Sequence, residues 1–193
     1  MNKFQNFIFS NRSYTPIPLA LSLFYFSSPT LPFSFIGLLL IFVGELVRIK
    51  AVSFAGGITR TVKVGAPKLI TEGPYSITRN PLYLGNMTIY FGVVFLAGGH
   101  YMFEFLLVTF LFFIFQYSMI ISLEEKTLSK LFDKNYQSYC DEVPRLFPKK
   151  LFWTSNLDNQ RSIFKTLKTE KRTLQNILLV IIFILFKYYS IGI

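Results

Sequence analysis

Five apolar runs, separated by short polar or charged stretches, constrain the fold of this chain more than any other feature. They cover residues 17–26, 31–47, 82–98, 103–123 and 174–189. The chain has 52% hydrophobic and 16% charged residues, including 23 Phe and 11 Tyr. A water-soluble domain of 193 residues has too much surface for its volume to bury so many large apolar side chains. The runs therefore predict an all-α polytopic membrane protein with about five transmembrane helices.

The lengths of the runs indicate which of them are long enough to cross a membrane as a helix. Residues 82–98 would extend about 25 Å as a helix, which suffices for a thin or tilted span. Residues 17–26 are too few to cross a bilayer unaided, and with 31–47 they are expected to form a tight helical hairpin through the turn at 27–30.

Basic residues fall almost entirely on one side of this five-span arrangement. Nineteen of the 20 Lys and Arg residues lie before the first run, between the second and third, or between the fourth and fifth; Lys187 is the exception. The positive-inside rule then places the N-terminus and residues 51–81 and 124–173 in the cytoplasm. This distribution accounts for the net charge of +10 without nucleic acid, and it favours contact with anionic membrane lipids.

The chain is expected to be a single domain, residues 1–193, with a catalytic core at about 44–148. Residues 51–81 are rich in Gly and Pro and predict a loop. Apolar residues at helical spacing from Leu128 to Tyr139 predict an amphipathic cytoplasmic helix that ends near Pro144. A basic interfacial segment at 149–173 and a transmembrane helix at 174–190 complete the predicted organisation.

Residue counts exclude several kinds of site. The chain has one Cys, Cys140, and one His, His100. One of each cannot form an internal disulfide or a zinc site of the usual kind, so no metal is expected. Glu45 lies inside the second run, where an acid is costly, but Arg48 one helical turn later is a candidate partner.

Two clusters of polar residues border the apolar runs. Pro81 starts the third run, and the free N–H groups of a helix start suit a ligand carboxylate. Glu124 and Glu125 end the fourth run, where two acids would oppose the helix dipole unless a cationic or hydroxyl-bearing ligand offset them. S-adenosylmethionine carries a carboxylate, a ribose diol and a sulfonium. The alternative is a solvated helix end whose acids pair with Arg79 or Lys126.

These clusters resemble the paired signature of the isoprenylcysteine carboxyl methyltransferase and phospholipid methyltransferase superfamily. The first motif runs from Leu69 to Gly85 and contains Gly73-Pro74-Tyr75, Arg79-Asn80-Pro81 and Tyr83. The second contains Glu124-Glu125, Leu128, Phe132, Tyr136, Tyr139 and Val143-Pro144-Arg145. Residues 44–51 also resemble the segment that precedes the first motif.

The resemblance implies an integral membrane methyltransferase that uses S-adenosylmethionine and acts on a lipophilic small molecule or lipid. The expected reaction is carboxyl O-methylation, as in the isoprenylcysteine enzymes, with amine N-methylation of a phospholipid as the alternative. A sterol-reductase-like oxidoreductase and a non-enzymatic membrane scaffold are the rival hypotheses.

The resemblance also implies roles for individual residues. The residues expected to bind the cofactor are Arg60, Pro67, Lys68, Leu69, Ile70, Tyr75, Asn80, Pro81, Leu82, Tyr83 and Glu124. The residues expected to act in catalysis are Arg79, Asn80, Glu124 and Arg145. Two positions depart from the family pattern. Asn80 stands where the family usually has His and cannot carry charge. Ile120 stands where prenylcysteine-methylating members have an Arg, which disfavours a carboxylate acceptor.

Overall fold

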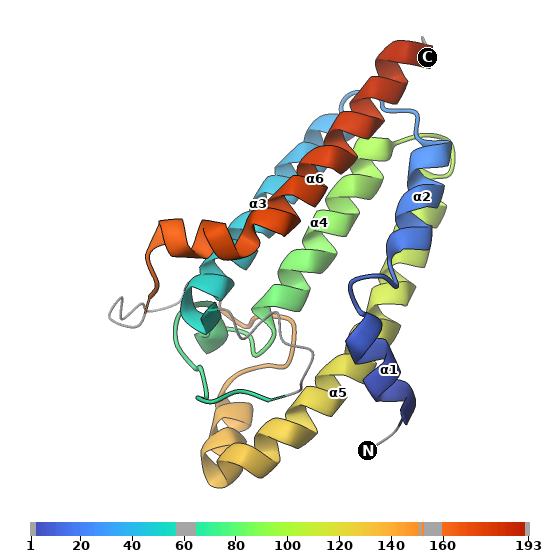
Figure 1. Cartoon of the computed structure of the whole chain (residues 1–193). Helices are drawn as coiled ribbons and strands as arrows, with labels where there is room; N and C mark the ends of the chain where they lie inside the picture. The colour runs from blue at the N-terminus through green and yellow to red at the C-terminus, as the bar shows by residue number, and fades with distance from the viewer. Residues whose placement is uncertain (1–2, 57–64, 151, 153–159, 192–193) are drawn as a thin grey trace.

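Helices that run side by side make up the described part of the chain (Figure 1). The computed structural model describes residues 3–56, 65–150, 152 and 160–191. The α-helices are α1 (Lys3–Asn11), α2 (Ile17–Phe26), α3 (Phe33–Ala55), α4 (Pro81–Ala97), α5 (Met102–Glu142) and α6 (Ile163–Ile191), with a short 3-10 helix, η2, at Gly73–Ser76. No β-strand occurs among these residues, and a single isolated bridge joins Ser28 to Gly98. The all-α prediction is therefore confirmed for the described chain.

Each apolar run lies within a helix except for Leu31, Pro32 and Gly98 at the ends of two runs, but the helix bounds correct the sequence prediction in two places. The chain is still helical over residues 51–55, where a loop was predicted, because Ala51, Val52 and Ala55 pack as buried residues before Gly56 ends α3. The fourth run continues as a helix into the amphipathic segment, and α5 then has a kink at Asp133, whose φ of 42° and ψ of −119° are not helical. Glu124 and Glu125 thus lie within a helix and not at its C-terminus, so the predicted opposition to the helix dipole was wrong.

Two of the described helices, α5 and α6, are long and apolar enough to cross a membrane by length and composition. The helices α2 and α4 are apolar but shorter, with 10 and 17 residues. Glu45, Arg48 and Lys50 interrupt the apolar character of α3. These helices fit a membrane protein, while the number of spans and their orientation stay predictions.

The helices α3 and α4 pack so closely that their backbones touch, and glycines make this possible. A Cβ atom added to Gly92 would lie 2.7 Å from the carbonyl oxygen of Gly37, and one added to Gly44 would lie 2.8 Å from that of Gly85. Membrane helices associate through such small residues because lipid provides no hydrophobic force between them. This pair forms the centre of the bundle.

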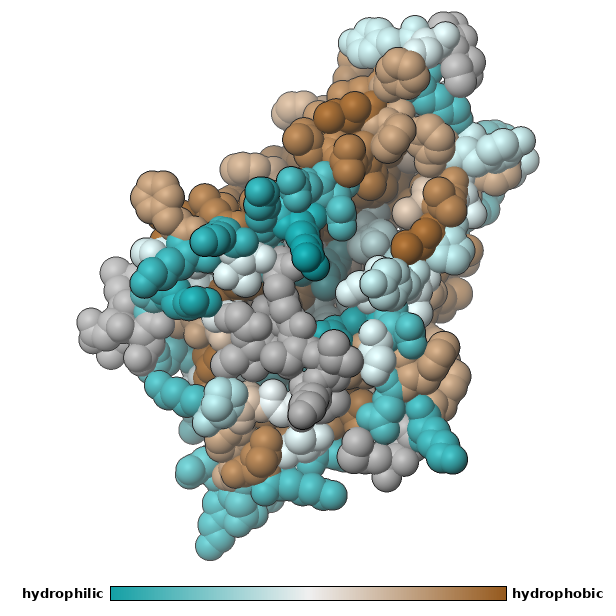
Figure 2. All heavy atoms as spheres, viewed as in Figure 1, coloured by the Kyte–Doolittle hydropathy of each residue, from teal (hydrophilic) through white to brown (hydrophobic). Residues whose placement is uncertain are grey.

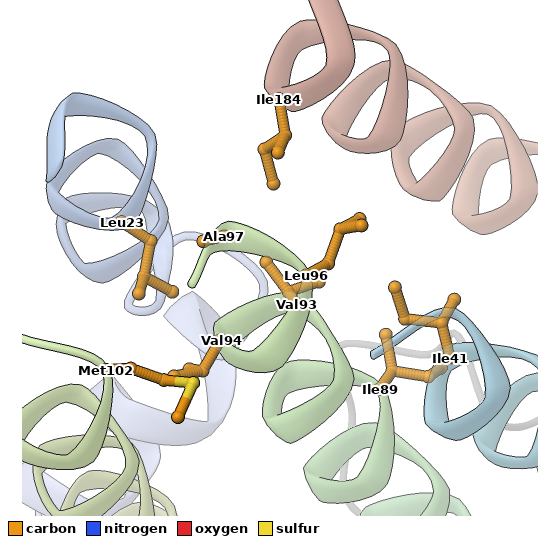
Figure 3. Close-up of a cluster of buried hydrophobic side chains, with 9 residues drawn as sticks. All are labelled: Leu23, Ile41, Ile89, Val93, Val94, Leu96, Ala97, Met102 and Ile184. Carbon is orange, nitrogen blue, oxygen red and sulfur yellow. The ribbon is translucent and has the colours of Figure 1, made fainter. Parts of the chain in front are cut away.

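Two apolar clusters attach the remaining helices to this centre. At one end, Leu23 of α2 and Ile184 of α6 pack around the last turns of α4 (Figure 3). Nearer the loops, Ile8 and Phe9 of α1 pack against the face of α5 that contains Ile120. The helix α1 was not predicted from sequence, because its nine residues are mostly polar or aromatic and show no long apolar run.

Replacing Gly92 by Ala is expected to lower the free energy of unfolding by about 1–3 kcal/mol, because the new methyl group forces the touching backbones apart. In an ordinary helix interior the same change would stabilise by about 1 kcal/mol, so the sign of the effect is diagnostic. Denaturant unfolding in detergent would measure it, with Val43→Ala on the exposed face of α3 as the control. A stabilised Gly92→Ala protein would contradict the close packing.

Candidate functional site

A cavity of about 640 Å³ opens among the loops and continues between the helices. Its loop end is lined by part of the segment 65–80 together with α4 and α5, and its inner end by residues of α2, α3, α4 and α6. Figure 2 shows polar side chains gathered mostly over the lower part of the molecule and apolar ones over the upper helices. Within the cavity, charged residues such as Lys68, Arg79 and Glu124 line the loop end, and Ala20, Val93 and Val180 line the inner end, as a site for a polar and an apolar ligand would require.

Hydrogen bonds fasten the loop before α4 to the segment after α5. The backbone N–H of Arg79 donates to the carbonyl of Pro144 at 2.9 Å, and the Asn80 side-chain amide donates to that of Arg145 at 2.7 Å. The Thr78 hydroxyl donates to the carbonyl of Leu146 at 2.7 Å. The two sequence motifs, about 65 residues apart, thus form one structural unit.

Glu125 holds the basic residues of both motifs. Its carboxylate lies 3.1 Å from the guanidinium of Arg79 and 2.8 Å from that of Arg145. Arg145 also donates to the Ser122 hydroxyl at 2.9 Å. This arrangement matches the alternative in which an acid of the pair binds Arg79, and it gives Glu125 a role in closing the loops.

Tyr75 is fixed at the loop end of the cavity. Its carbonyl accepts a hydrogen bond from the Tyr139 hydroxyl at 2.6 Å, and its phenol lines the cavity. The preceding Gly73 has a φ of +58° and lies against the Phe54 ring, which leaves no room for a side chain. Burial raises the pKa of the Tyr75 phenol above its ordinary value, so at neutral pH it is an uncharged donor or acceptor.

Glu124 faces the cavity from α5. It accepts a hydrogen bond from the Tyr83 hydroxyl at 2.9 Å, and Arg12, at the end of α1, is close enough to interact electrostatically. The first turn of α4, which begins at Pro81, also lines this end. A carboxylate, phenols and the N–H groups of a helix start therefore converge on one space.

A second polar group lines the cavity deeper among the helices. The guanidinium of Arg48 lies 2.5 Å from the Glu170 carboxylate and 3.3 Å from that of Glu45, and it donates to the Asn86 side-chain oxygen. Arg48 and Glu170 are 8% and 1% exposed. The predicted Glu45–Arg48 pair is confirmed, and Glu170 joins it from α6.

Comparison with known protein families gives one match. The family model described as phospholipid methyltransferase matches residues 33–135, just over half of the chain. The chain belongs to the phospholipid methyltransferase family. This family falls within the superfamily that the sequence motifs resembled. Neither the curated proteins nor the solved structures gave a match.

Most of the family residues singled out from the sequence lie together in the cavity wall. They are Lys68, Leu69, Ile70, Tyr75, Arg79, Asn80, Pro81, Leu82, Tyr83 and Glu124. Pro67 and Arg145 lie beside the cavity without lining it, and Arg60 falls outside the described residues. The roles assigned to all of these residues stay predictions.

Several cavity residues were not predicted as site residues. The cavity wall also contains Arg12, Asn86, Tyr117 and Glu170. None of these four residues belongs to either motif. Asn86 follows the first motif directly, so its position on α4 could have indicated it. Ile120, by contrast, is fully buried in the cluster beneath α1 and does not line the cavity.

Thr78→Val is expected to lower the free energy of unfolding by about 1–3 kcal/mol, because it removes the buried Thr78 hydroxyl that donates to the Leu146 carbonyl. The change preserves side-chain shape, so packing is little affected. Thr169→Val, at an exposed hydroxyl bonded within its own helix, is the matched control. Equal unfolding free energies for the two variants, measured by denaturant titration, would show that this link between the motifs is unimportant.

Proposed function

We propose that the protein is a membrane methyltransferase that transfers a methyl group from S-adenosylmethionine to a lipophilic acceptor. The observation that carries the proposal is the single cavity that joins the family motifs to an apolar space between helices. Membership of a methyltransferase family supports the reaction class. The two-ended cavity supports a polar donor at the loops and an apolar acceptor among the helices.

The residues at the loop end fit the chemical groups of this cofactor. Glu124 offers a carboxylate to an amino group or a ribose diol, and the N–H groups at the start of α4 suit a carboxylate. Tyr75, Leu69 and Ile70 provide an aromatic ring and apolar side chains for an adenine ring. Lys68 adds a positive charge at the rim.

When bound, S-adenosylmethionine supplies a methyl group whose bond to sulfur breaks as the acceptor's lone pair forms the new bond. The protein holds the two reactants in line and excludes water. Such positioning can lower the reaction barrier by about 7–11 kcal/mol. Glu125 with Arg79 and Arg145 would keep the loops closed over the reactants. Tyr83 would orient the Glu124 carboxylate through its hydrogen bond.

The distribution of charge favours an amine over a carboxylate as the acceptor group. A carboxylate entering the apolar space needs a cation to offset its desolvation. Arg48 already faces two carboxylates, those of Glu45 and Glu170, and Arg79 is paired with Glu125. These two pairings favour amine N-methylation over carboxyl O-methylation of a prenylcysteine. A carboxylate acceptor would have to use Arg12, Lys68 or Arg172, which also line the cavity.

Calorimetric titration with S-adenosylhomocysteine tests the donor. We expect binding, and we expect Glu124→Gln to weaken it roughly ten- to a hundredfold, because a hydrogen bond to a charged group is worth about 1.5–3 kcal/mol. Glu125→Gln is the matched control and should weaken binding less. No binding to the parent protein, or preferential binding of a nicotinamide dinucleotide, would refute the proposed function in favour of a scaffold or a reductase.

Methyl transfer assays with two acceptors test the charge argument. We expect faster transfer to octylamine than to a farnesylcysteine analogue, with the rate rising at alkaline pH because the amine must lose a proton before it attacks. The carboxylate acceptor should show no such rise. Efficient methylation of the farnesylcysteine analogue would mean that a cation of the cavity wall serves the carboxylate, and it would restore the O-methylation assignment.

A further inference from the structure

The helices α2 and α6 meet above the cavity in a contact that we call the outer seam, formed by Leu23, Phe24, Phe183, Ile184 and Lys187. The rings of Phe24 and Phe183 meet edge to face at 5.7 Å. The Lys187 ammonium donates to the carbonyls of Phe24 and Ser27, each at 3.1 Å, and to that of Tyr25 at 2.5 Å. These carbonyls end α2, where a helix leaves its acceptors without internal partners. The seam is therefore held by both polar and apolar contacts.

The seam residues continue the helix faces that line the cavity. On α2, Ala20 lines the cavity, and Leu23 follows it by three residues. On α6, Val180 lines the cavity, and Ile184 follows it by four. Residues three or four apart lie on the same face of a helix. The side chains of Ala20 and Val180 thus leave space inside the cavity. Leu23 and Ile184, one turn further along, fill the corresponding space beyond it.

Leu23 and Ile184 lie one turn beyond the residues of α2 and α6 that line the cavity. Each is 2% exposed, and Figure 3 shows Ile184 pointing from α6 toward α4, across from Leu23. Both belong to the same cluster as Val93, the last residue of α4 that lines the cavity. Tightly packed side chains therefore bound the cavity at its apolar end.

The height of the apolar space follows from the rise of α4. Asn86 marks the polar level beside Arg48, and Val93 marks the top, seven residues or about 10 Å further along the helix. One leaflet of a bilayer has a hydrocarbon depth of about 15 Å, half of the usual 30 Å core. An acyl chain that spans one leaflet is therefore longer than the apolar part of the cavity.

We propose that the outer seam limits the length of the acceptor's apolar part, so that the acceptor is an amphiphile whose chain is shorter than a membrane leaflet. This inference rests on the proposed function, and it narrows the acceptor from any membrane lipid to molecules with a medium-length chain. Ile184 and Leu23 set the limit, and Ala20 and Val180 set the width below it. They are specificity-determining residues and take no part in the chemistry.

Binding of straight-chain alkanols, from hexanol to hexadecanol, tests the limit without requiring activity. Equilibrium dialysis would measure their affinity for S-adenosylhomocysteine-saturated protein in detergent, per free alkanol in water. Each methylene buried in the cavity should raise affinity about fourfold. We expect this rise to continue to near decanol and then to stop, because longer chains meet the seam. A rise that continues to hexadecanol would overturn the proposal, since it would mean that the chain leaves the cavity sideways.

Two variants with opposite effects connect the limit to the seam. Ile184→Ala should move the plateau to longer alkanols, and Ala20→Leu should move it to shorter ones. Val94→Ala is the matched control, because Val94 is equally buried in the same cluster but does not lie on the faces of α2 and α6 that continue the cavity wall. Should Ile184→Ala fail to fold, Ala20→Leu alone still decides, and an unchanged plateau in that variant would refute the role of the seam.

The outcomes for this inference and for the proposed function are separable. Failure of the parent protein to bind S-adenosylhomocysteine would refute the proposed function, whatever the alkanols do. Binding of S-adenosylhomocysteine together with alkanol affinities that show no plateau would leave the function in place and refute the length limit.

Discussion

The backbone contact between α3 and α4 is the constraint on which the other features depend. Because Gly85 has no side chain, the aliphatic part of Arg48 lies directly against α4, where a Cβ on Gly85 would be 2.7 Å from Arg48 Cγ. From that position the guanidinium meets Asn86 on α4 and Glu170 on α6. A buried ion pair is costly to break, because the partner left behind is an uncompensated charge. The glycine contact thus determines where α6 attaches and where the inner wall of the cavity lies.

The cavity wall has two sources in the chain. The loop end comes mainly from residues 65–80, the start of α4 and the middle of α5, most of which lie within the family match at 33–135. The inner end adds Pro16 and Ala20 near the N-terminus and the α6 residues from Glu170 to Val180, which lie outside that match. The proposed donor end therefore lies mostly within the family match, whereas the proposed acceptor end combines matched residues of α4 with flanking segments outside the match.

Much of the helical framework could be predicted, because long apolar runs leave a chain in lipid few alternatives to helix. Each of the five runs lies in a helix apart from residues at the ends of two runs, and the spacing from Leu128 to Tyr139 correctly predicted a helical segment whose tyrosines are buried. Neither the continuity of α5 through Glu124 nor its kink at Asp133 could be predicted, since a change from apolar to amphipathic sequence looks the same whether or not the helix is interrupted. The short helix α1 carries no periodic signal strong enough to be seen alone.

The site residues also divide into those that the sequence could predict and those that it could not. Residues at the loop end could be singled out because the motifs keep them close together in sequence. The pairing of Arg48 with Glu170 joins positions 122 residues apart, and no local pattern specifies such a contact. Ile120 illustrates the opposite difficulty, because its spacing from Glu124 places it one turn away, yet α1 covers that face and removes it from the cavity.

The placement of the outer seam outside the family match has an evolutionary consequence. Substitutions at Leu23, Ala20, Val180 or Ile184 alter the inner space of the cavity without touching the loops that the two motifs bind together. A duplicated gene could therefore diverge toward a new acceptor by exchanging a few side chains on α2 and α6. Descendants of such a duplication would retain the same central motifs while methylating different molecules. The sequence differences that set their acceptors would lie in α2 and α6.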